Sequence, residues 1–304
     1  MSELIRIADE VAEALRQDRA VVALETTLVS HGFPPGEGAE VASESEHRVR
    51  AANAVPATIG VLDGAIRVGL TGAEVERFSA AGDRARKVGP RDLAACVVQG
   101  ALGATTVGGT LAVCGRVGIR FLGTGGLGGV HRGWAAGPPD VSADLAELTR
   151  SSVLVVSSGA KSLLDVPATS ELLETLGIPV LGWRTAELPL FYTALGGPPV
   201  SARVETVDEA AAVARAHWQL GRIGSLVLAR PPDESLDEVE PLVQRALARA
   251  RAEGVSGQAV TPFVLSYLHR ESGGRTLGAN RELVAANAGL AAEVAVAYAS
   301  GLAP

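Results

Sequence analysis

Lysine is almost absent from this chain of 304 residues, which carries two lysines and twenty-five arginines. One of the two, Lys161, follows the largely apolar run 152–156 through a short Ser-Ser-Gly-Ala segment. Arginine supplies positive charge as well as lysine does, but only an amine can lose its proton and attack carbon. Burial at the end of a strand would favour the neutral amine. The spacing therefore predicts an imine-forming nucleophile, against the simpler interpretation of a solvated surface lysine.

Further charged residues fall where a predicted strand or glycine-rich loop ends. They are Glu25 after a short apolar run, Lys87 in a loop ahead of a helix, and Asp140 and Asp144 at the start of the helix before the Lys161 strand. Such ends converge in open α/β sheets, so we expect these side chains to share one site. An amine facing carbon, with a carboxylic acid nearby to move protons, is the minimum equipment for imine formation at a sugar aldehyde or hemiacetal. Taken singly, each residue could instead cap a helix or form a surface ion pair.

Apolar periodicity and turn residues predict the elements that position these side chains. Helical spacing after a Ser2 N-cap predicts a helix over 4–15, segment 26–36 reads as a loop, and Asp63-Gly64 predicts an antiparallel hairpin. Further strands are predicted over 21–24, 119–122, 152–156, 178–182 and 224–229. Helices are predicted after 36, 71 and 93, after the segment 104–110, and over 170–176, 235–253 and 280–299. The alternation, without a linker or an internal repeat, predicts a single three-layer α/β/α domain over residues 1–304 with a mixed central sheet.

Composition excludes several classes of partner. A net charge of −7 and the lack of a long basic block argue against nucleic acid, while a small anionic ligand still fits. Cys96 and Cys114 lack metal-ligand spacing and read as buried thiols in a reducing compartment, so we expect no disulfide. We find neither a signal peptide nor an apolar run of about 18 residues, which predicts a cytoplasmic protein without a membrane partner.

Cofactor signals are weak. The glycine-rich loop 123–133 lacks the GxGxxG order of dinucleotide sites, although a glycine loop at a strand end can hold an anion against backbone amides. No pair of histidines stands at i and i+4. A hard cation held mostly through water, with one protein carboxylate, is the most that the sequence supports.

With these positions laid out, the chain resembles the pseudouridine-5'-phosphate glycosidase family, also called indigoidine synthase A-like, nearly end to end. The resemblance rests on motifs in the same order, among them LETTLVSHG at 24–32, VPATI at 55–59, GATTV at 103–107, DVSADL at 140–145, SGAKS at 158–162 and TPF at 261–263. It implies an enzyme that reversibly joins or splits the C–C bond between ribose 5-phosphate and uracil. It also implies a divalent cation, commonly Mn²⁺, and a homotrimer.

The resemblance also assigns roles residue by residue. Lys161 matches the nucleophile that forms an imine with C1' of the ring-opened ribose, and Glu25 matches the proton donor. The other matched positions are Lys87, Val107, His131, Ser142, Ala143, Asp144 and Asn287 for the substrate, and Asp140 for the metal.

Departures from the family pattern surround the base and the metal. Pro90 replaces a basic residue, the loop 133–140 is longer and carries prolines, and Ala286 precedes Asn287 where two asparagines are common. These changes favour keeping a second hypothesis, a C-ribosyl synthase that attaches ribose 5-phosphate to an aromatic secondary metabolite. A non-catalytic phosphosugar-binding protein and an aldolase-type enzyme that needs no nucleobase are further alternatives, because fold does not fix function.

Overall fold

An eleven-stranded mixed sheet forms the centre of the protein. The structure, a computed structural model, describes residues 4–34, 36–133, 140–161, 163–255 and 260–301. The strand order is β1-β4-β3-β2-β7-β8-β11-β9-β10, with β6 also on β3 and β5 on β6. Only the pairings of β3 with β4 and with β6 are antiparallel among these strands. The strands are β1 (Ile5–Ile7), β2 (Val21–Glu25), β3 (Val55–Leu62), β4 (Ala65–Val68), β5 (Arg86–Val88), β6 (Gly103–Thr105), β7 (Phe121–Gly123), β8 (Leu154–Ser157), β9 (Val180–Trp183), β10 (Ala202–Val204) and β11 (Leu226–Ala229).

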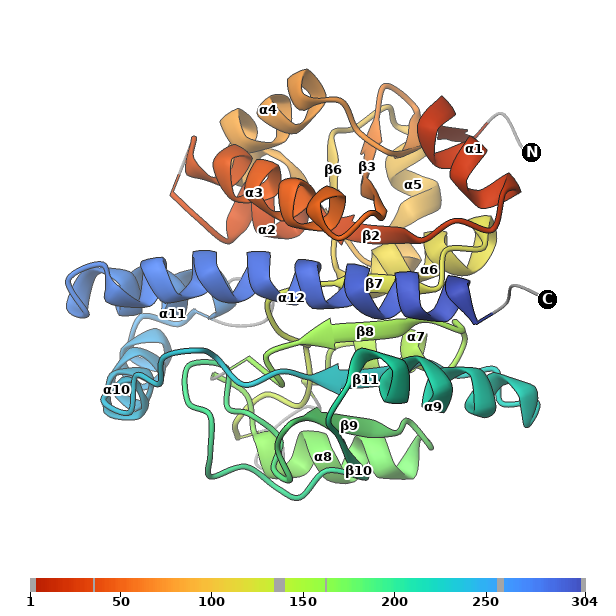
Figure 1. Cartoon of the computed structure of the whole chain (residues 1–304). Coiled ribbons are helices and arrows are strands. Elements are labelled where there is room, and N and C mark those ends of the chain that lie inside the picture. The colour runs from red at the N-terminus through yellow and green to blue at the C-terminus, as the bar shows by residue number, and fades with distance from the viewer. Residues whose placement is uncertain (1–3, 35, 134–139, 162, 256–259, 302–304) are drawn as a thin grey trace.

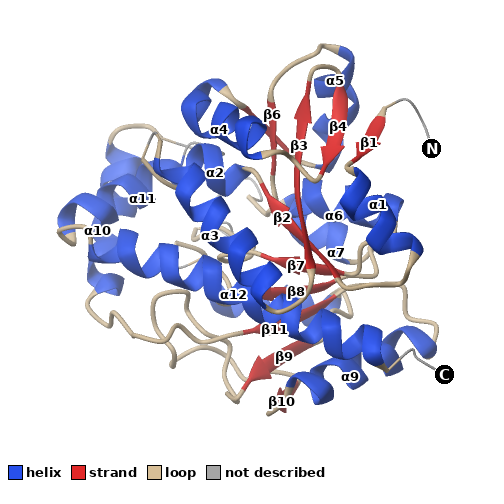
Figure 2. Cartoon of the chain, turned by 45° about the horizontal axis from the view of Figure 1, so that its top comes forward, coloured by secondary structure: helices blue, strands red, loops and turns tan. Residues whose placement is uncertain are grey.

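Helices cover both faces of this sheet, and α12 crosses the middle of one face with α3 and α9 beside it (Figures 1 and 2). Helices α10 and α11 pack against each other near one end of α12. The helices are α1 (Asp9–Arg16), α2 (Thr27–His31), α3 (Glu37–Ala51), α4 (Gly72–Ala81), α5 (Leu93–Val98), α6 (Val107–Val117), α7 (Ala143–Leu148), α8 (Val166–Thr175), α9 (Val207–Gln219), α10 (Val239–Ala252), α11 (Val260–Glu271) and α12 (Arg275–Ser300), with 3-10 turns at Gly82–Arg84 and Pro90–Asp92.

Strand β2 shows how the sequence builds three layers. Successive residues of a strand point to opposite faces of the sheet. Val21 and Ala23 belong to the core that contains residues of α1, α6 and α7, whereas Val22 and Leu24 belong to the core that contains residues of α9 and α12. The predicted three-layer α/β/α fold with a mixed sheet is confirmed, and its extension as one domain over 1–304 stays a prediction.

The predicted start of the N-terminal helix is wrong. Residues 5–7 form β1, which pairs in parallel with β4 through Ile5 and Ile66, and α1 begins only at Asp9. The apolar residues in this segment fit the spacing of a helix and also that of a strand. Pairing with the free edge of β4 favours the strand. Ser2 lies outside the described residues.

Two segments expected as loops are ordered elements. Thr27–His31 forms α2, and Lys87 lies in strand β5, opposite Ala104 of β6, rather than in a loop. The predicted hairpin at Asp63 and the capping box at Thr71 are confirmed. Three of the predicted helices begin elsewhere, α8 at Val166, α10 at Val239 and α12 at Arg275, and β10, α9 and α11 were not predicted.

Helix α12 has an apolar window long enough to cross a membrane by length and composition, contrary to the expectation from the sequence. In the fold, 56% of that window is buried inside the protein, where α12 packs against β2, β7 and β8. The buried part of α12 therefore contributes apolar surface to the core of the protein. Cys96 and Cys114 are buried and free, as predicted.

Candidate active site

The carboxyl ends of three neighbouring parallel strands meet at one edge of the sheet. Strand β2 ends at Glu25, Thr124 follows β7, and Ser158 follows β8, with the three strands in register. Lys161 comes three residues later, and its backbone N–H donates to Leu127 O at 3.1 Å. Parallel pairing thus brings the amine and the acid to one place, as the sequence predicted.

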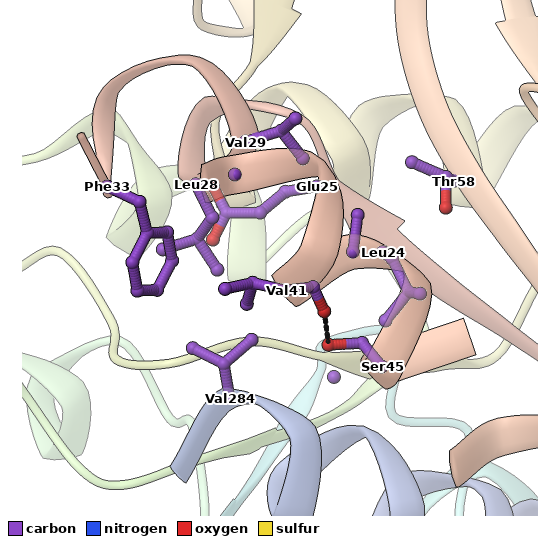
Figure 3. Close-up of a pocket in the computed structure, with 12 residues that line it drawn as sticks. Leu24, Glu25, Leu28, Val29, Phe33, Val41, Ser45, Thr58 and Val284 are labelled. Carbon is purple, nitrogen blue, oxygen red and sulfur yellow. Dashed lines mark hydrogen bonds between the residues drawn. The ribbon is translucent and has the colours of Figure 1, made fainter. Parts of the chain in front are cut away.

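Glu25 is buried, with 5% of its surface exposed. Burial raises the pKa of its carboxyl, and the attraction of Lys161 and a hydrogen bond donated by Thr124 Oγ1 to Oε1 oppose that rise. A mostly apolar cavity of about 20 Å³ lies beside Glu25, and Figure 3 shows Phe33 and Val284 on its wall. These surroundings favour a protonated carboxyl, which is the form that can give a proton to a substrate.

Lys87 enters the same site from β5. Burial lowers the pKa of its amine, and the neighbouring charge of Lys161 lowers it further, while Asp144 and Glu25 raise it. Two amines and two carboxyl groups from distant parts of the sequence therefore act on one another electrostatically. Of the charged residues expected to share one site, the structure brings these four within electrostatic reach, and their roles stay predictions.

Asp144 ties two backbone segments of the site together. Its Oδ1 accepts a hydrogen bond from Gly108 N at 2.8 Å, and its Oδ2 accepts one from Gly128 N at 3.1 Å. Ser142 caps α7 and accepts from Asp144 N at 3.2 Å. A Cβ on Gly128 would come within 2.3 Å of Ser142 Oγ, so this approach requires glycine. The carboxylate holds the start of α6 against the glycine loop, and direct contact of Ser142 or Asp144 with substrate stays a prediction.

Val107 and Ala143 carry apolar side chains, so each can offer a polar substrate only its backbone. Val107 is buried at the first position of α6, and Ala143 is exposed at the first position of α7. The first N–H groups of a helix have no partner within the helix. Substrate binding by either residue stays a prediction.

Asn287 reaches the same edge from α12. It is completely buried, and its Nδ2 donates to Thr124 O at 2.8 Å, Gly125 O at 3.3 Å and Ser158 Oγ at 3.1 Å. The amide therefore fixes the two loops that carry the site. Its predicted place beside the base is not tested by these contacts.

His131 and Asp140 lie together at the outer side of the site. His131 Nδ1 is 3.8 Å from Asp140 Oδ2, and 48% of the Asp140 side chain is exposed. Burial lowers the pKa of His131, Asp140 opposes that fall, and the charges of Lys87 and Lys161 add to it, which favours the neutral imidazole. Among the described residues no three His, Cys, Asp or Glu side chains form a metal-binding group. An open carboxylate fits a cation that keeps most of its water.

Thr124 was not predicted as a site residue because it stands within the glycine-rich loop 123–133. A hydroxyl directly after a buried strand, beside another strand that ends in a carboxylate, was the available signal. Residues 134–139, in the loop that departs from the family pattern, and Ser162, in the SGAKS motif, lie outside the described residues.

Known proteins that resemble this chain are enzymes of glycosyl-bond chemistry. A pseudouridine-5'-phosphate glycosidase of Chloroflexus aurantiacus is 49% identical, with 96% of this chain and 98% of the relative covered. One of Escherichia coli K12 is 42% identical, with 97% and 96% covered. The solved structure of the prealnumycin C-glycosynthase AlnA with ribulose 5-phosphate superposes with a TM-score of 0.90 at 41% identity, covering 100% of this chain and 99% of that one.

A buried acid and an amine at the carboxyl edge of this sheet, in a chain so similar to these proteins, define an enzyme that cleaves or forms a glycosyl bond. The family described as indigoidine synthase A like protein matches residues 10–297. The chain belongs to that family, and the resemblance stated from its motifs is confirmed.

Proposed function

We propose that this protein reversibly splits pseudouridine 5'-phosphate and water into uracil and ribose 5-phosphate through an imine on Lys161. The observation that carries the proposal is the convergence at one sheet edge of Lys161 and the buried Glu25, whose pKa is raised by burial. Relatives of matching length, 42% to 49% identical, bear the name of this activity.

The C–C bond explains why an amine is needed. The base leaves through carbon, so direct displacement by water would expel a poor, carbanion-like leaving group. In the proposed route Lys161 Nζ bonds to C1', and the ring oxygen leaves C1' and takes a proton. The electron pair of the C–C bond then passes to the base carbon, which is protonated, while nitrogen and C1' form the imine. Water hydrolyses the imine, which releases ribose 5-phosphate and restores the amine.

Glu25 supplies protons in this scheme. A carboxyl whose pKa is raised by burial holds its proton nearer to neutral pH and can transfer it to carbon or to the ring oxygen. Lys87 adds positive charge at the same site, which suits a phosphorylated substrate.

We further propose that Asp140 holds a divalent cation, Mn²⁺ first among those to test, with His131 beside it. When bound, the ion would supply positive charge to oxygens of the substrate.

Borohydride trapping tests the proposal directly. Incubation with ribose 5-phosphate and reduction should attach the sugar to Lys161, which peptide mass analysis would identify. Lys161→Arg should keep the charge and the fold but give no adduct and no turnover. An active enzyme without an adduct on Lys161, or turnover by the arginine variant, would overturn the imine mechanism.

A second candidate function is attachment of ribose 5-phosphate to an aromatic aglycone other than uracil. The similarity to AlnA over the whole chain supports it. Incubation of ribose 5-phosphate and Mn²⁺ with and without uracil separates the two functions, because only the first yields pseudouridine 5'-phosphate. Sugar conversion without any aromatic partner would indicate an aldolase-type reaction. Binding without turnover would indicate a phosphosugar-binding protein.

A homotrimer and a cytoplasmic location are also proposed for this chain, on its family membership. Sedimentation equilibrium of the purified protein would measure the assembly. A monomer at micromolar concentration would refute the first, and fractionation of the producing cell would test the second.

A further inference from the structure

Phe191 has an unusual backbone for a bulky residue. Its φ is +67°, in the left-handed region that residues other than glycine, asparagine and aspartate rarely adopt. Such a conformation costs free energy and persists only where the surroundings enforce it. The surroundings here are the segment that carries Lys161, since Phe191 N donates to Ser158 O at 3.1 Å.

The ring of Phe191 lies against the glycine loop beside the Lys161 side chain. A Cβ placed on Gly126 would lie 2.6 Å from Phe191 Cδ2 and 3.4 Å from Lys161 Cγ. The phenyl ring and the methylene chain of the lysine therefore share the space that a side chain at Gly126 would take. The ring is 4% exposed, so it presents an apolar wall at this point.

A second contact locks the same two segments together. Gly159, with φ +77°, forms a β-bridge with Leu190, and a Cβ at Gly159 would lie 2.0 Å from Pro189 O. The backbone before Phe191 thus packs directly on the backbone before Lys161. Tyr192 packs edge-on against the ring of Phe191, with the ring centres 4.7 Å apart.

We propose that Phe191 is a positioning residue for the nucleophile: its ring restricts the Lys161 side chain and keeps water from that side of it. The inference rests on the proposed role of Lys161. A side chain with several rotatable bonds loses reactivity when it samples orientations that do not face the substrate carbon. The strained backbone at Phe191 is the cost of placing a rigid ring there.

The two lysines of this chain make a sensitive test. Formaldehyde with cyanoborohydride methylates accessible amines, and one digest of the intact protein reports Lys161 and Lys87 separately. Phe191→Ala should raise the methylation rate of Lys161 several-fold while that of Lys87 stays unchanged. General loosening of the fold would raise both rates, so a merely structural role is distinguishable.

The reaction should respond in the opposite direction. Phe191→Ala should slow borohydride trapping of ribose 5-phosphate at saturation by about tenfold or more, with little change in the concentration for half-saturation. Phe191→Leu keeps an apolar wall and should fall between the alanine variant and the wild type. It also serves if the alanine variant fails to fold.

Tyr192→Phe is the matched control. It keeps the supporting ring and removes a hydroxyl that no described residue hydrogen-bonds, so both readouts should stay at wild-type values. An unchanged ratio of Lys161 to Lys87 methylation in both Phe191 variants would overturn the inference. Absence of a sugar adduct in the wild type would refute the proposed function instead, and the methylation ratio would still decide the placement of the ring.

Discussion

Thr124 Oγ1 donates a hydrogen bond to Glu25 Oε1 between the ends of the adjacent strands β7 and β2. The bond stabilises the charged carboxylate and so lowers the pKa that burial raises. The acidity of Glu25 is therefore set by a balance between its apolar surroundings, one hydroxyl and the charge of Lys161.

Removing that hydroxyl should shift the pH dependence of turnover. Thr124→Val keeps the shape of the side chain but removes the donor, so the pKa of Glu25 should rise further. The proton donor then stays protonated to higher pH, and the basic limb of the kcat profile should move upward. Thr149→Val, which removes an exposed hydroxyl that donates to Ala146 O in the same helix turn, is the control. A shift to lower pH would contradict the assignment.

Glu25→Gln should reduce kcat by about 10²-fold to 10⁴-fold, the usual contribution of a positioned acid or base. The amide keeps the size of the side chain and can still accept from Thr124, so circular dichroism should be unchanged. Steady-state kinetics with pseudouridine 5'-phosphate measure the effect. A loss smaller than about tenfold would assign the proton transfer to another group.

Glu25→Gln should also change how the free energy of unfolding depends on pH. Because the folded-state pKa is raised, the folded protein holds the proton more tightly than the unfolded chain does. The contribution is present below the unfolded pKa of about 4.3 and is lost as pH rises through the folded value. Urea unfolding of wild type and Glu25→Gln across this range should show the wild type losing stability relative to the variant. Parallel curves would mean that the carboxyl is not desolvated.

Asp144→Asn should destabilise the protein because an amide cannot accept from both Gly108 N and Gly128 N as the carboxylate does. One buried N–H would face an NH₂ group, at a cost of about 1–3 kcal/mol in the free energy of unfolding. Asp140→Asn makes the same change at a half-exposed carboxylate and should stay within about 0.5 kcal/mol. Equal losses of stability in the two variants would argue against this role of the Asp144 carboxylate.

Gly128→Ala should disturb the same contact between Asp144 and the glycine-rich loop. The added methyl group would lie 2.6 Å from Asp144 Oδ2, so the carboxylate or the loop must move, at a cost of about 1–3 kcal/mol. Gly278→Ala, in the interior of α12 with nothing within 4 Å, should instead stabilise by about 1 kcal/mol. Thermal unfolding compares the two, and a neutral Gly128 variant would show that the loop yields freely.

The strand that carries Glu25 was predictable because local and tertiary signals agree there. All five residues of β2 are buried, and the first four form the continuous apolar run that is typical of a central parallel strand. Lys87 was misplaced because β5 has three residues and its ladder partner, Ala104, lies far along the chain. No local pattern contains that pairing.

The site residues also divide into those that local sequence signals predict and those that depend on contacts between distant segments. Strand ends place Glu25 and Lys161 correctly, since parallel strands share an edge. The roles of Asn287 as a loop anchor and of Phe191 as a wall depend on contacts between remote segments. Their residue types are unremarkable in sequence, so only the folded arrangement reveals them.

Helix α12 gives the site a late point of completion. Every strand of the described sheet ends by Ala229, yet the carbonyls of Thr124 and Gly125 receive the Asn287 amide from this later helix, and Gly123 packs on Ala288. A nascent chain that has made all the strands of the described sheet but not α12 therefore lacks this support for the loops after β7 and β8. During synthesis, the segments that carry Thr124 and Lys161 would gain their anchor only after α12 has left the ribosome.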